Sequence, residues 1–404
     1  MSSELLLLSK SKKVLYYLIL FIADLFLWFI ILKEMKGRKR VLRASVLVLK
    51  TAVTALFLFL LIRILLYNGE FADPANAFRQ IQMGTMAALL VTASAACLAV
   101  TLLKWMISLF RGRNSGTSGI ANSLIFILLT LLVADGYFRQ RLDIRTTRQT
   151  LTVSGLDPAL DGMKIALIAD IHISSWNDSY DRLDRAMQAV GDENPDLILN
   201  TGDFITFGWQ EFGESDTILR KAKASAGAFA VEGNHDDGSY YPGYENSFGA
   251  ESSRMVRMKI EASGYTLLRD SAALISHRGT HIAIAGVTTR GHRLDMNYGN
   301  FEKVLTPIPD TLFTILLLHD PAGWLLSSVA GRLPDLTVAG HTHGFQVGLP
   351  GRGWSPSALI HEQWRGLYEF RGSNLYVSTG LGTMGMAARF FMPPEIVILT
   401  LHAD

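Results

Sequence analysis

The sequence is short of cysteine and of charge. Cys97 is its only cysteine among 404 residues and lies inside an apolar run. A disulfide framework or a thiolate zinc site needs several cysteines, so both are excluded. Charged residues make up 18% of the chain, below the roughly 25% that is usual in soluble domains, and the deficit falls in the first third. The formal net charge of +2 argues against nucleic acid as a partner.

Long apolar runs fill that first third. The first run follows several lysines, as in a signal peptide, but it is too long for one and lacks a small-residue cleavage site. A buried bundle in a soluble protein is the alternative, and it explains four such runs poorly. Because a helix needs about 20 apolar residues to cross a bilayer, we predict a membrane domain over residues 1–140. Its four helices are expected at about 14–32, 46–67, 86–103 and 120–138.

Ionisable side chains interrupt two of the predicted spans. Asp24 lies near the middle of the first span, and Lys50 and Arg63 lie within the second. A charge at membrane depth is costly and usually has a partner. We therefore predict that Asp24 pairs with Lys50 or Arg63; alternatively, both cations extend to opposite membrane surfaces.

Basic residues in short loops predict the orientation. The loop after the first span holds the densest positive cluster, between Lys33 and Arg43, and such loops stay in the cytoplasm. The lysines before the first span and the arginines between Arg139 and Arg148 argue the other way. We predict a multi-pass protein of the cell membrane whose C-terminal domain is extracytoplasmic.

From about Leu151 the composition is that of a globular α/β domain. Apolar runs of strand length recur, bounded by glycine, aspartate or asparagine. Between the first two, residues 179–191 have one apolar helical face and Pro195 stops the helix. We predict a linker and first strand over 141–160, then one α/β domain over 161–404 with two layered sheets flanked by helices. The strand runs are 163–169, 197–201, 226–231, 281–287, 312–318, 336–339 and 374–377.

Five short polar blocks follow these runs, where loops gather side chains at the edge of a sheet. Each block alone is more typical of a loop, a helix cap or a structural histidine. Together they supply carboxylate, amide and imidazole groups for two divalent ions, and mixed N/O ligands suit Mn, Fe, Zn or Co. The blocks are Ala169-Asp170-Ile171-His172, Gly202-Asp203, Gly233-Asn234-His235-Asp236, His319-Asp320 and Gly340-His341-Thr342-His343.

The five blocks resemble those of the calcineurin-like metallophosphoesterases, whose pattern is D-x-H, G-D, G-N-H-[D/E], H and G-H-x-H. The resemblance covers residues 164–401 and implies a four-layer α/β/β/α sandwich. The sequence is similar to the membrane-linked YkuE-like branch in Gly340–Gly344 with Gln346, and in the Gly380-Leu381-Gly382-Thr383 and Pro393-Pro394-Glu395-Ile396 motifs. Phe345 stands where that branch usually has a second glycine, which should alter the wall near the site.

The resemblance also implies a role for each block. Asp203 would bridge two ions that clamp the phosphoryl group and activate a water, whose hydroxide attacks phosphorus in line. His235 would protonate the leaving oxygen or stabilise the transition state, and Asp236 would orient its ring. The first ion would be held by Asp170, His172, Asp203 and His343, and the second by Asp203, Asn234, His319 and His341.

Three arginines are candidate substrate contacts. Arg290 and Arg293 follow a strand end, and Arg389 precedes Phe390 and Phe391. A solvated loop explains the first two equally well, and Arg389 is alternatively an interfacial anchor. The remaining histidines are expected at the surface or in structural positions: His277, His281, His361 and His402.

These features predict a membrane-anchored phosphohydrolase that cleaves a phosphodiester or pyrophosphate. A site tethered beside a bilayer favours a lipid-linked substrate, and a soluble nucleotide is the alternative. A catalytically silent metal-binding sensor or scaffold is the rival from another class, but every ligand position is filled. A transporter is disfavoured because the spans carry no midplane binding constellation. The sequence leaves the native metal and the oligomeric state open.

Overall fold

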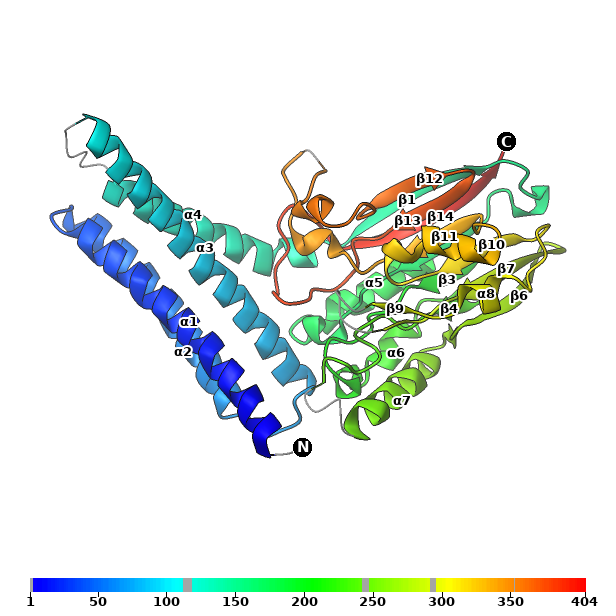
Figure 1. Cartoon of the computed structure of the whole chain (residues 1–404), viewed down its shortest axis with the longest axis horizontal. Coiled ribbons are helices and arrows are strands. Elements are labelled where there is room, and N and C mark those ends of the chain that lie inside the picture. The colour runs from blue at the N-terminus through cyan, green and yellow to red at the C-terminus, as the bar shows by residue number, and fades with distance from the viewer. Residues whose placement is uncertain (1–2, 112–117, 242–246, 291–295, 352) are drawn as a thin grey trace. The chain divides into compact units, whose positions relative to one another are not determined.

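The computed structural model describes residues 3–111, 118–241, 247–290, 296–351 and 353–404 (Figure 1). They form two compact units. We call the first the membrane unit because its helices are long and apolar, and it comprises Met1–Asn68, Arg79–Arg139 and Gly385–Ala388. The catalytic unit comprises Gly69–Phe78, Gln140–Met384 and Arg389–Asp404. The membrane unit therefore includes Gly385–Ala388, and the catalytic unit includes Gly69–Phe78 and the predicted linker, beyond the predicted limits of each domain.

The membrane unit is built from four helices, α1 (Ser3–Met35), α2 (Arg40–Leu65), α3 (Pro74–Arg111) and α4 (Ser118–Phe138). Each overlaps one predicted span. Among the described residues, three stretches are long and apolar enough to cross a membrane: Arg40–Leu65, Pro74–Phe110 and Ile120–Leu142. Passage of α1 across the bilayer stays a prediction.

A buried ion pair joins α1 to α2. Lys50 Nζ lies 2.6 Å from Asp24 Oδ1, and both side chains are almost fully buried. Lys50 also donates to Thr54 Oγ1 (2.7 Å), which in turn donates to the Asp24 carboxylate (3.1 Å). This confirms the predicted pairing with Lys50. The closed network explains how two charges are tolerated among apolar helices.

The catalytic unit contains two six-stranded sheets. Each of the seven predicted strand runs overlaps an observed strand. The first sheet has the order β1 (Arg145–Val153), β14 (Glu395–Ala403), β2 (Lys164–Ile168), β3 (Leu197–Asn200), β4 (Ala228–Ala230) and β5 (Thr266–Leu267). The second has the order β12 (Gly366–Phe370), β13 (Ser373–Val377), β11 (Leu336–Ala339), β10 (Phe313–Leu317), β7 (Thr280–Gly286) and β6 (Ser271–His277).

Alternation along the strands produces the layers. Ile165 and Leu167 of β2 pack with residues of the second sheet in a shared core. Ala166 and Ile168, on the other face, pack with α5 (Tyr180–Asp192) and α7 (Ser247–Ala262). The outer face of the second sheet is covered by α8 (Phe301–Leu305). The result is the predicted four-layer α/β/β/α architecture, with its elements labelled in Figure 1.

All five polar blocks follow strands that run parallel to a neighbour. In the first sheet β2, β3 and β4 run parallel, and in the second β10 runs parallel to β11. Since the carboxyl ends of parallel strands share one edge of a sheet, the loops after these strands are brought together.

The segment Gly69–Phe78, which includes the start of α3, packs within the catalytic unit. Phe71 lies edge-on to Phe207 at a centroid distance of 5.1 Å and to Tyr241 at 6.2 Å. The Tyr241 hydroxyl donates to Glu70 Oε2 (3.2 Å). This segment therefore supports the loop that begins after Asp203.

Candidate metal centre

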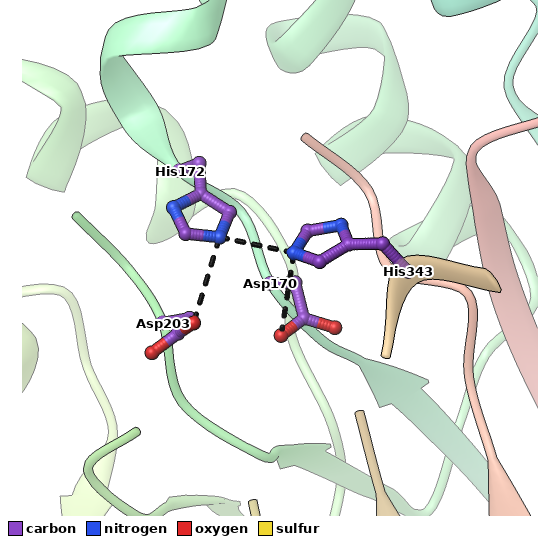
Figure 2. Close-up of side chains that lie close together, drawn as sticks. All are labelled: Asp170, His172, Asp203 and His343. Atoms are coloured by element: carbon purple, nitrogen blue, oxygen red, sulfur yellow. Dashed lines mark hydrogen bonds and ion pairs between the residues drawn. The ribbon is translucent and has the colours of Figure 1, made fainter. Parts of the chain in front are cut away.

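Four of the predicted ligands converge in the catalytic unit (Figure 2). Nε2 of His172 lies 3.1 Å from Nε2 of His343 and 3.5 Å from Asp203 Oδ2. Nε2 of His343 lies 4.0 Å from Asp170 Oδ1. One ligand atom from each of the four side chains lies within 4.8 Å of all the others, and all four residues are buried.

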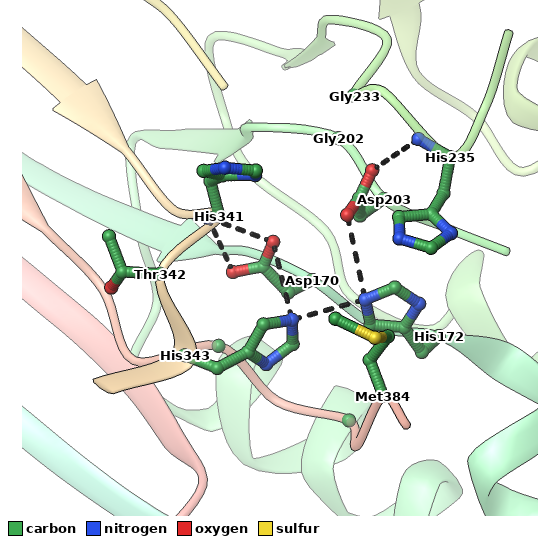
Figure 3. A network of polar contacts seen from close by, with 12 residues as sticks. Asp170, His172, Gly202, Asp203, Gly233, His235, His341, Thr342, His343 and Met384 are labelled. Atoms are coloured by element: carbon green, nitrogen blue, oxygen red, sulfur yellow. Dashed lines mark hydrogen bonds and ion pairs between the residues drawn. The ribbon is translucent and has the colours of Figure 1, made fainter. Parts of the chain in front are cut away.

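A second cluster shares Asp203 with the first. Nε2 of His319 lies 3.4 Å from Asp203 Oδ2, 2.9 Å from Asn234 Oδ1 and 3.1 Å from His341 Nδ1. The ligand atoms of Asp203, His319 and His341 also lie within 4.8 Å of one another. The structure thus brings the predicted ligands together as two groups that meet at one carboxylate, as the network in Figure 3 shows in part.

The backbone at these residues is strained. A left-handed conformation costs most L-residues roughly 1–3 kcal/mol and persists only where the surroundings impose it. Here it turns each side chain inward immediately after its strand. The left-handed residues in the two clusters are Asp170, His172, Asp203, His341 and His343.

Two glycines allow the loops carrying Asp203 and Asn234 to touch. A Cβ added to Gly202 would lie 2.2 Å from the Gly233 nitrogen, and one added to Gly233 would lie 2.2 Å from Asp203 Oδ1. Neither position has room for a side chain, so the Gly-Asp and Gly-Asn-His-Asp motifs need their glycines for this close approach.

Thr201 and Thr206 fix the orientation of the rings. The Thr201 carbonyl accepts from Nδ1 of His319 (2.9 Å), which leaves Nε2 facing the cluster. Thr206 contacts Nδ1 of His172 through its hydroxyl (3.1 Å) and Nδ1 of His235 through its carbonyl (2.6 Å). Metal-binding histidines commonly use their second nitrogen in this way. Neither threonine was predicted, because two of the three contacts use backbone carbonyls, which every residue type has.

The ionisation states suit cations. Burial lowers the pKa of His172 to about 3 and that of His341 to about 4, so both rings are neutral near pH 7, the form that binds metal. Burial also opposes ionisation of Asp203, but His319 and His235 outweigh it and hold its pKa well below the usual range. Burial opposes protonation of His319, but Asp203 outweighs it and raises the pKa of that ring to about 10. A carboxylate that attracts positive charge, beside neutral rings at His172 and His341, fits divalent ions.

The sequence comparisons agree with this geometry. The family model for calcineurin-like phosphoesterases matches residues 163–345. The metallophosphoesterase YkuE of Bacillus subtilis is 31% identical over 268 residues, which cover 64% of this chain and 86% of YkuE. The chain belongs to the calcineurin-like metallophosphoesterases. It is therefore a hydrolase of phosphoric esters, in a family that uses two divalent metals.

Two further relatives of this metallophosphoesterase carry named activities. UDP-2,3-diacylglucosamine pyrophosphatase LpxG of Chlamydia muridarum is 29% identical, with 59% of this chain and 84% of LpxG covered. Phosphodiesterase YaeI of Escherichia coli is 26% identical, with 59% of this chain and 82% of YaeI covered.

Asp236 does not have the predicted contact with the His235 ring. Its buried carboxylate accepts backbone N–H groups from Asp203 (2.7 Å), Phe204 (2.9 Å) and Gly233 (2.9 Å). The prediction that Asp236 orients His235 is therefore wrong. The carboxylate instead ties together the two loops that carry Asp203 and Asn234.

Tyr240 is the side chain that contacts the His235 ring. The two rings stack at a centroid distance of 3.9 Å and an interplanar angle of 8°. The Tyr240 hydroxyl accepts from Asn234 Nδ2 (2.9 Å), which turns Asn234 Oδ1 toward His319. Tyr240 thus positions two site residues, the predicted metal ligand Asn234 and the predicted catalytic residue His235.

Substitution of Tyr240 should separate these two effects. Tyr240→Phe keeps the stacking but removes the acceptor for Asn234, and we expect metal affinity to fall about tenfold. Tyr240→Leu removes both contacts, so turnover at saturating metal should fall as well. Metal titrations followed by rate measurements test this, with Tyr241→Phe as the control. Equal behaviour of both Tyr240 variants and the control would contradict the positioning role.

Arg389 is not placed as a substrate contact. Its side chain is fully buried, and its guanidinium donates to the carbonyls of Thr379 (2.9 Å), Gly380 (3.0 Å) and Gly382 (2.6 Å), with longer contacts to Met392 and Pro393. The prediction of a phosphate contact at Arg389 is therefore wrong. The arginine shapes the loop that backs Asp170, whose carbonyl accepts from Gly382 N–H (2.8 Å).

Loss of this guanidinium should destabilise the catalytic unit. Arg389→Met leaves several buried carbonyls without a donor, and we expect the free energy of unfolding to fall by about 2–3 kcal/mol. Thermal or denaturant unfolding of the full-length protein measures the change. The exposed Arg254 of α7 gives the control variant Arg254→Met, and an equal stability of the two variants would contradict the structural role.

The remaining candidates have separate outcomes. Arg290 is exposed on the short strand β8 (Thr289–Arg290), which pairs with β9 (Asn297–Tyr298), and its contact with substrate stays a prediction. Arg293 lies outside the described residues. His361, expected at the surface or in a structural position, lies with its ring centroid 6.1 Å from that of His341 and 5.9 Å from that of Phe345. Phe345 thus contacts the ring of His361, which in turn contacts His341, and its effect on the wall near the site stays a prediction.

Proposed function

We propose that this metallophosphoesterase is anchored in the membrane and cleaves a phosphodiester or pyrophosphate bond of a lipid-linked substrate. The observation that carries the hydrolytic part is the pair of buried ligand groups meeting at Asp203. Support for the lipid part comes from the long apolar helices and from LpxG, a relative named for a diacylated nucleotide sugar.

The side chains divide the work of the reaction. The first ion would be held by Asp170, His172, Asp203 and His343, and the second by Asp203, Asn234, His319 and His341. Two bound divalent ions supply Lewis-acid stabilisation of the phosphoryl oxygens and a nucleophilic water near neutral pH.

We assign protonation of the leaving oxygen to His235. Its Nδ1 donates to the Thr206 carbonyl (2.6 Å), so Nε2 is the nitrogen from which the protonated ring would give its second proton to the departing oxygen. Its ring lies edge-on to His172 at a centroid distance of 5.0 Å, which places it beside the first cluster. The ring is held in this position by Tyr240.

Hydrolysis of bis-p-nitrophenyl phosphate by the full-length protein in detergent tests the proposal. The full chain is needed because Gly69–Phe78 packs within the catalytic unit. Turnover that requires Mn²⁺, is removed by chelator and is lost in Asn234→Ala is the expected result. Two bound ions without turnover on this ester or on a lipid pyrophosphate would favour the silent sensor or scaffold.

We also propose that the catalytic unit is extracytoplasmic. The basic residues between Lys33 and Arg43 support this orientation. A reporter enzyme that is active only outside the cytoplasm, fused after Asp404, should be active. Inactivity of that fusion, with activity of the same reporter inserted at Gly37, would reverse the assignment.

A further inference from the structure

The membrane unit contains a groove of about 270 Å³ between α2, α3 and α4. Its wall is apolar, and its polar side chains are Gln82, Thr85, Thr130 and Tyr137. Gln82 Nε2 donates to the Tyr137 hydroxyl (2.6 Å). The other lining residues are Val53, Leu56, Leu60, Met86, Leu89, Val133, Ala134 and Phe138.

The groove lies at the end of the helices that leads into the catalytic unit. Leu60 is near the end of α2, Gln82 is in the first third of α3, and Phe138 is the last residue of α4. The catalytic unit resumes at Gln140, two residues after Phe138. Gln82 and Tyr137 mark this end, while Val53, Leu89 and Thr130 lie further along their helices.

The segment Gly385–Ala388, which we call the strap, contacts a groove residue and follows the loop that is hydrogen-bonded to Asp170. Gly385–Ala388 belongs to the membrane unit, where Ala387 N–H donates to Thr85 Oγ1 (2.7 Å). A Cβ on Gly84 would lie 1.7 Å from the Gly385 oxygen, so α3 admits the strap only at a glycine. Gly382, three residues before the strap, is hydrogen-bonded to Asp170.

We propose that this groove binds one acyl chain of the lipid that carries the scissile phosphoester. This inference deepens the proposed function and rests on it. An apolar groove in helices long enough to span a membrane faces hydrocarbon, so an acyl chain is the occupant that its wall matches. The polar end suits the point where the chain joins its headgroup. This polar end is the end of α4 after which the chain continues into the catalytic unit.

The test uses the full-length protein in phosphatidylcholine nanodiscs. The probe is CDP-diacylglycerol, a diacyl lipid joined to a nucleotide through a pyrophosphate, with a photoreactive diazirine in one acyl chain. Val133→Trp fills the groove, and Leu131→Trp, at an exposed site two residues away on α4, is the matched control. Bis-p-nitrophenyl phosphate reports on the metal site without an acyl chain.

We expect cross-links to the groove-lining peptides in the parent and the control protein, and their loss in Val133→Trp. The kcat/KM for the lipid should fall more than about tenfold in Val133→Trp, since excluding even one methylene from a pocket costs about that much. Turnover of bis-p-nitrophenyl phosphate should be unchanged in both variants.

The possible failures are distinguishable. Lipid cleavage that is equal in all three proteins, or cross-links spread evenly over α4, would overturn the groove assignment and leave the phosphohydrolase intact. The same holds if the parent protein turns over bis-p-nitrophenyl phosphate but not the lipid. Groove cross-links without hydrolysis of either ester would overturn the proposed reaction and retain the lipid site.

Discussion

Asp203→Asn is expected to lower kcat/KM for bis-p-nitrophenyl phosphate by about 10³-fold or more, a loss of roughly 4 kcal/mol in transition-state stabilisation. The carboxylate lies 3.5 Å from the His172 nitrogen of one cluster and 3.4 Å from the His319 nitrogen of the other. Asparagine has nearly the same shape but no charge, so the change removes what the two groups share. Metal analysis of the purified protein should show fewer than two bound ions.

The exposed Asp192, at the end of α5, provides the matched control. Asp192→Asn removes the same charge at an exposed position outside the two ligand clusters. It should retain both ions and full turnover. If Asp203→Asn kept two ions and most of its activity, the bridging role of Asp203 would have to be abandoned.

The second large effect is expected at His235. In His235→Asn, turnover of a diester with a strongly basic leaving group should fall by about 10²–10³-fold, because no side chain then supplies the proton. The fall should be smaller for p-nitrophenolate, which leaves readily without a proton. Comparing kcat for bis-p-nitrophenyl phosphate and methyl phenyl phosphate measures this difference.

His402→Asn is the control for His235. This histidine is on β14, where its Nδ1 contacts Asp161 Oδ1 (2.9 Å), and its loss should leave both rates unchanged. An equal loss of both rates in His235→Asn, with bound metal intact, would argue that His235 stabilises the phosphoryl group instead of the leaving oxygen.

The sequence predicts most of this site because its apolar runs indicate where strands end. Asp170, Asp203, His319 and His341 each follow an apolar run within three residues, and parallel pairing brings those ends together. The same reasoning predicts seven of the strands. β14 is not among them, although its residues Ile396–Leu399 are apolar, and its parallel pairing with β1 joins positions about 250 apart in the chain. No local pattern encodes such a distant partner.

The errors in the site have a common physical origin. Asp236 is adjacent to His235 in sequence, but the turn directs its carboxylate to backbone N–H groups of another loop. Arg389 carries a charge that is typical of a phosphate contact, yet carbonyl oxygens surround it. In both cases the partner is main chain, which is the same for every residue type. Tyr240 is missed for a different reason, since nothing in the sequence indicates which of many possible partners a loop tyrosine contacts.

The exchange of segments between the two units has a consequence for biosynthesis. Gly69–Phe78 is made before the rest of the catalytic unit, whereas Gly385–Ala388 is made after the rest of the membrane unit and most of the catalytic unit. Until then, Thr85 and Gly84 on α3 lack the backbone they contact in the finished protein. The packing of α3 is therefore incomplete until Gly385–Ala388 has been synthesised. A chain released before Gly385 would leave Thr85 and Gly84 without these contacts.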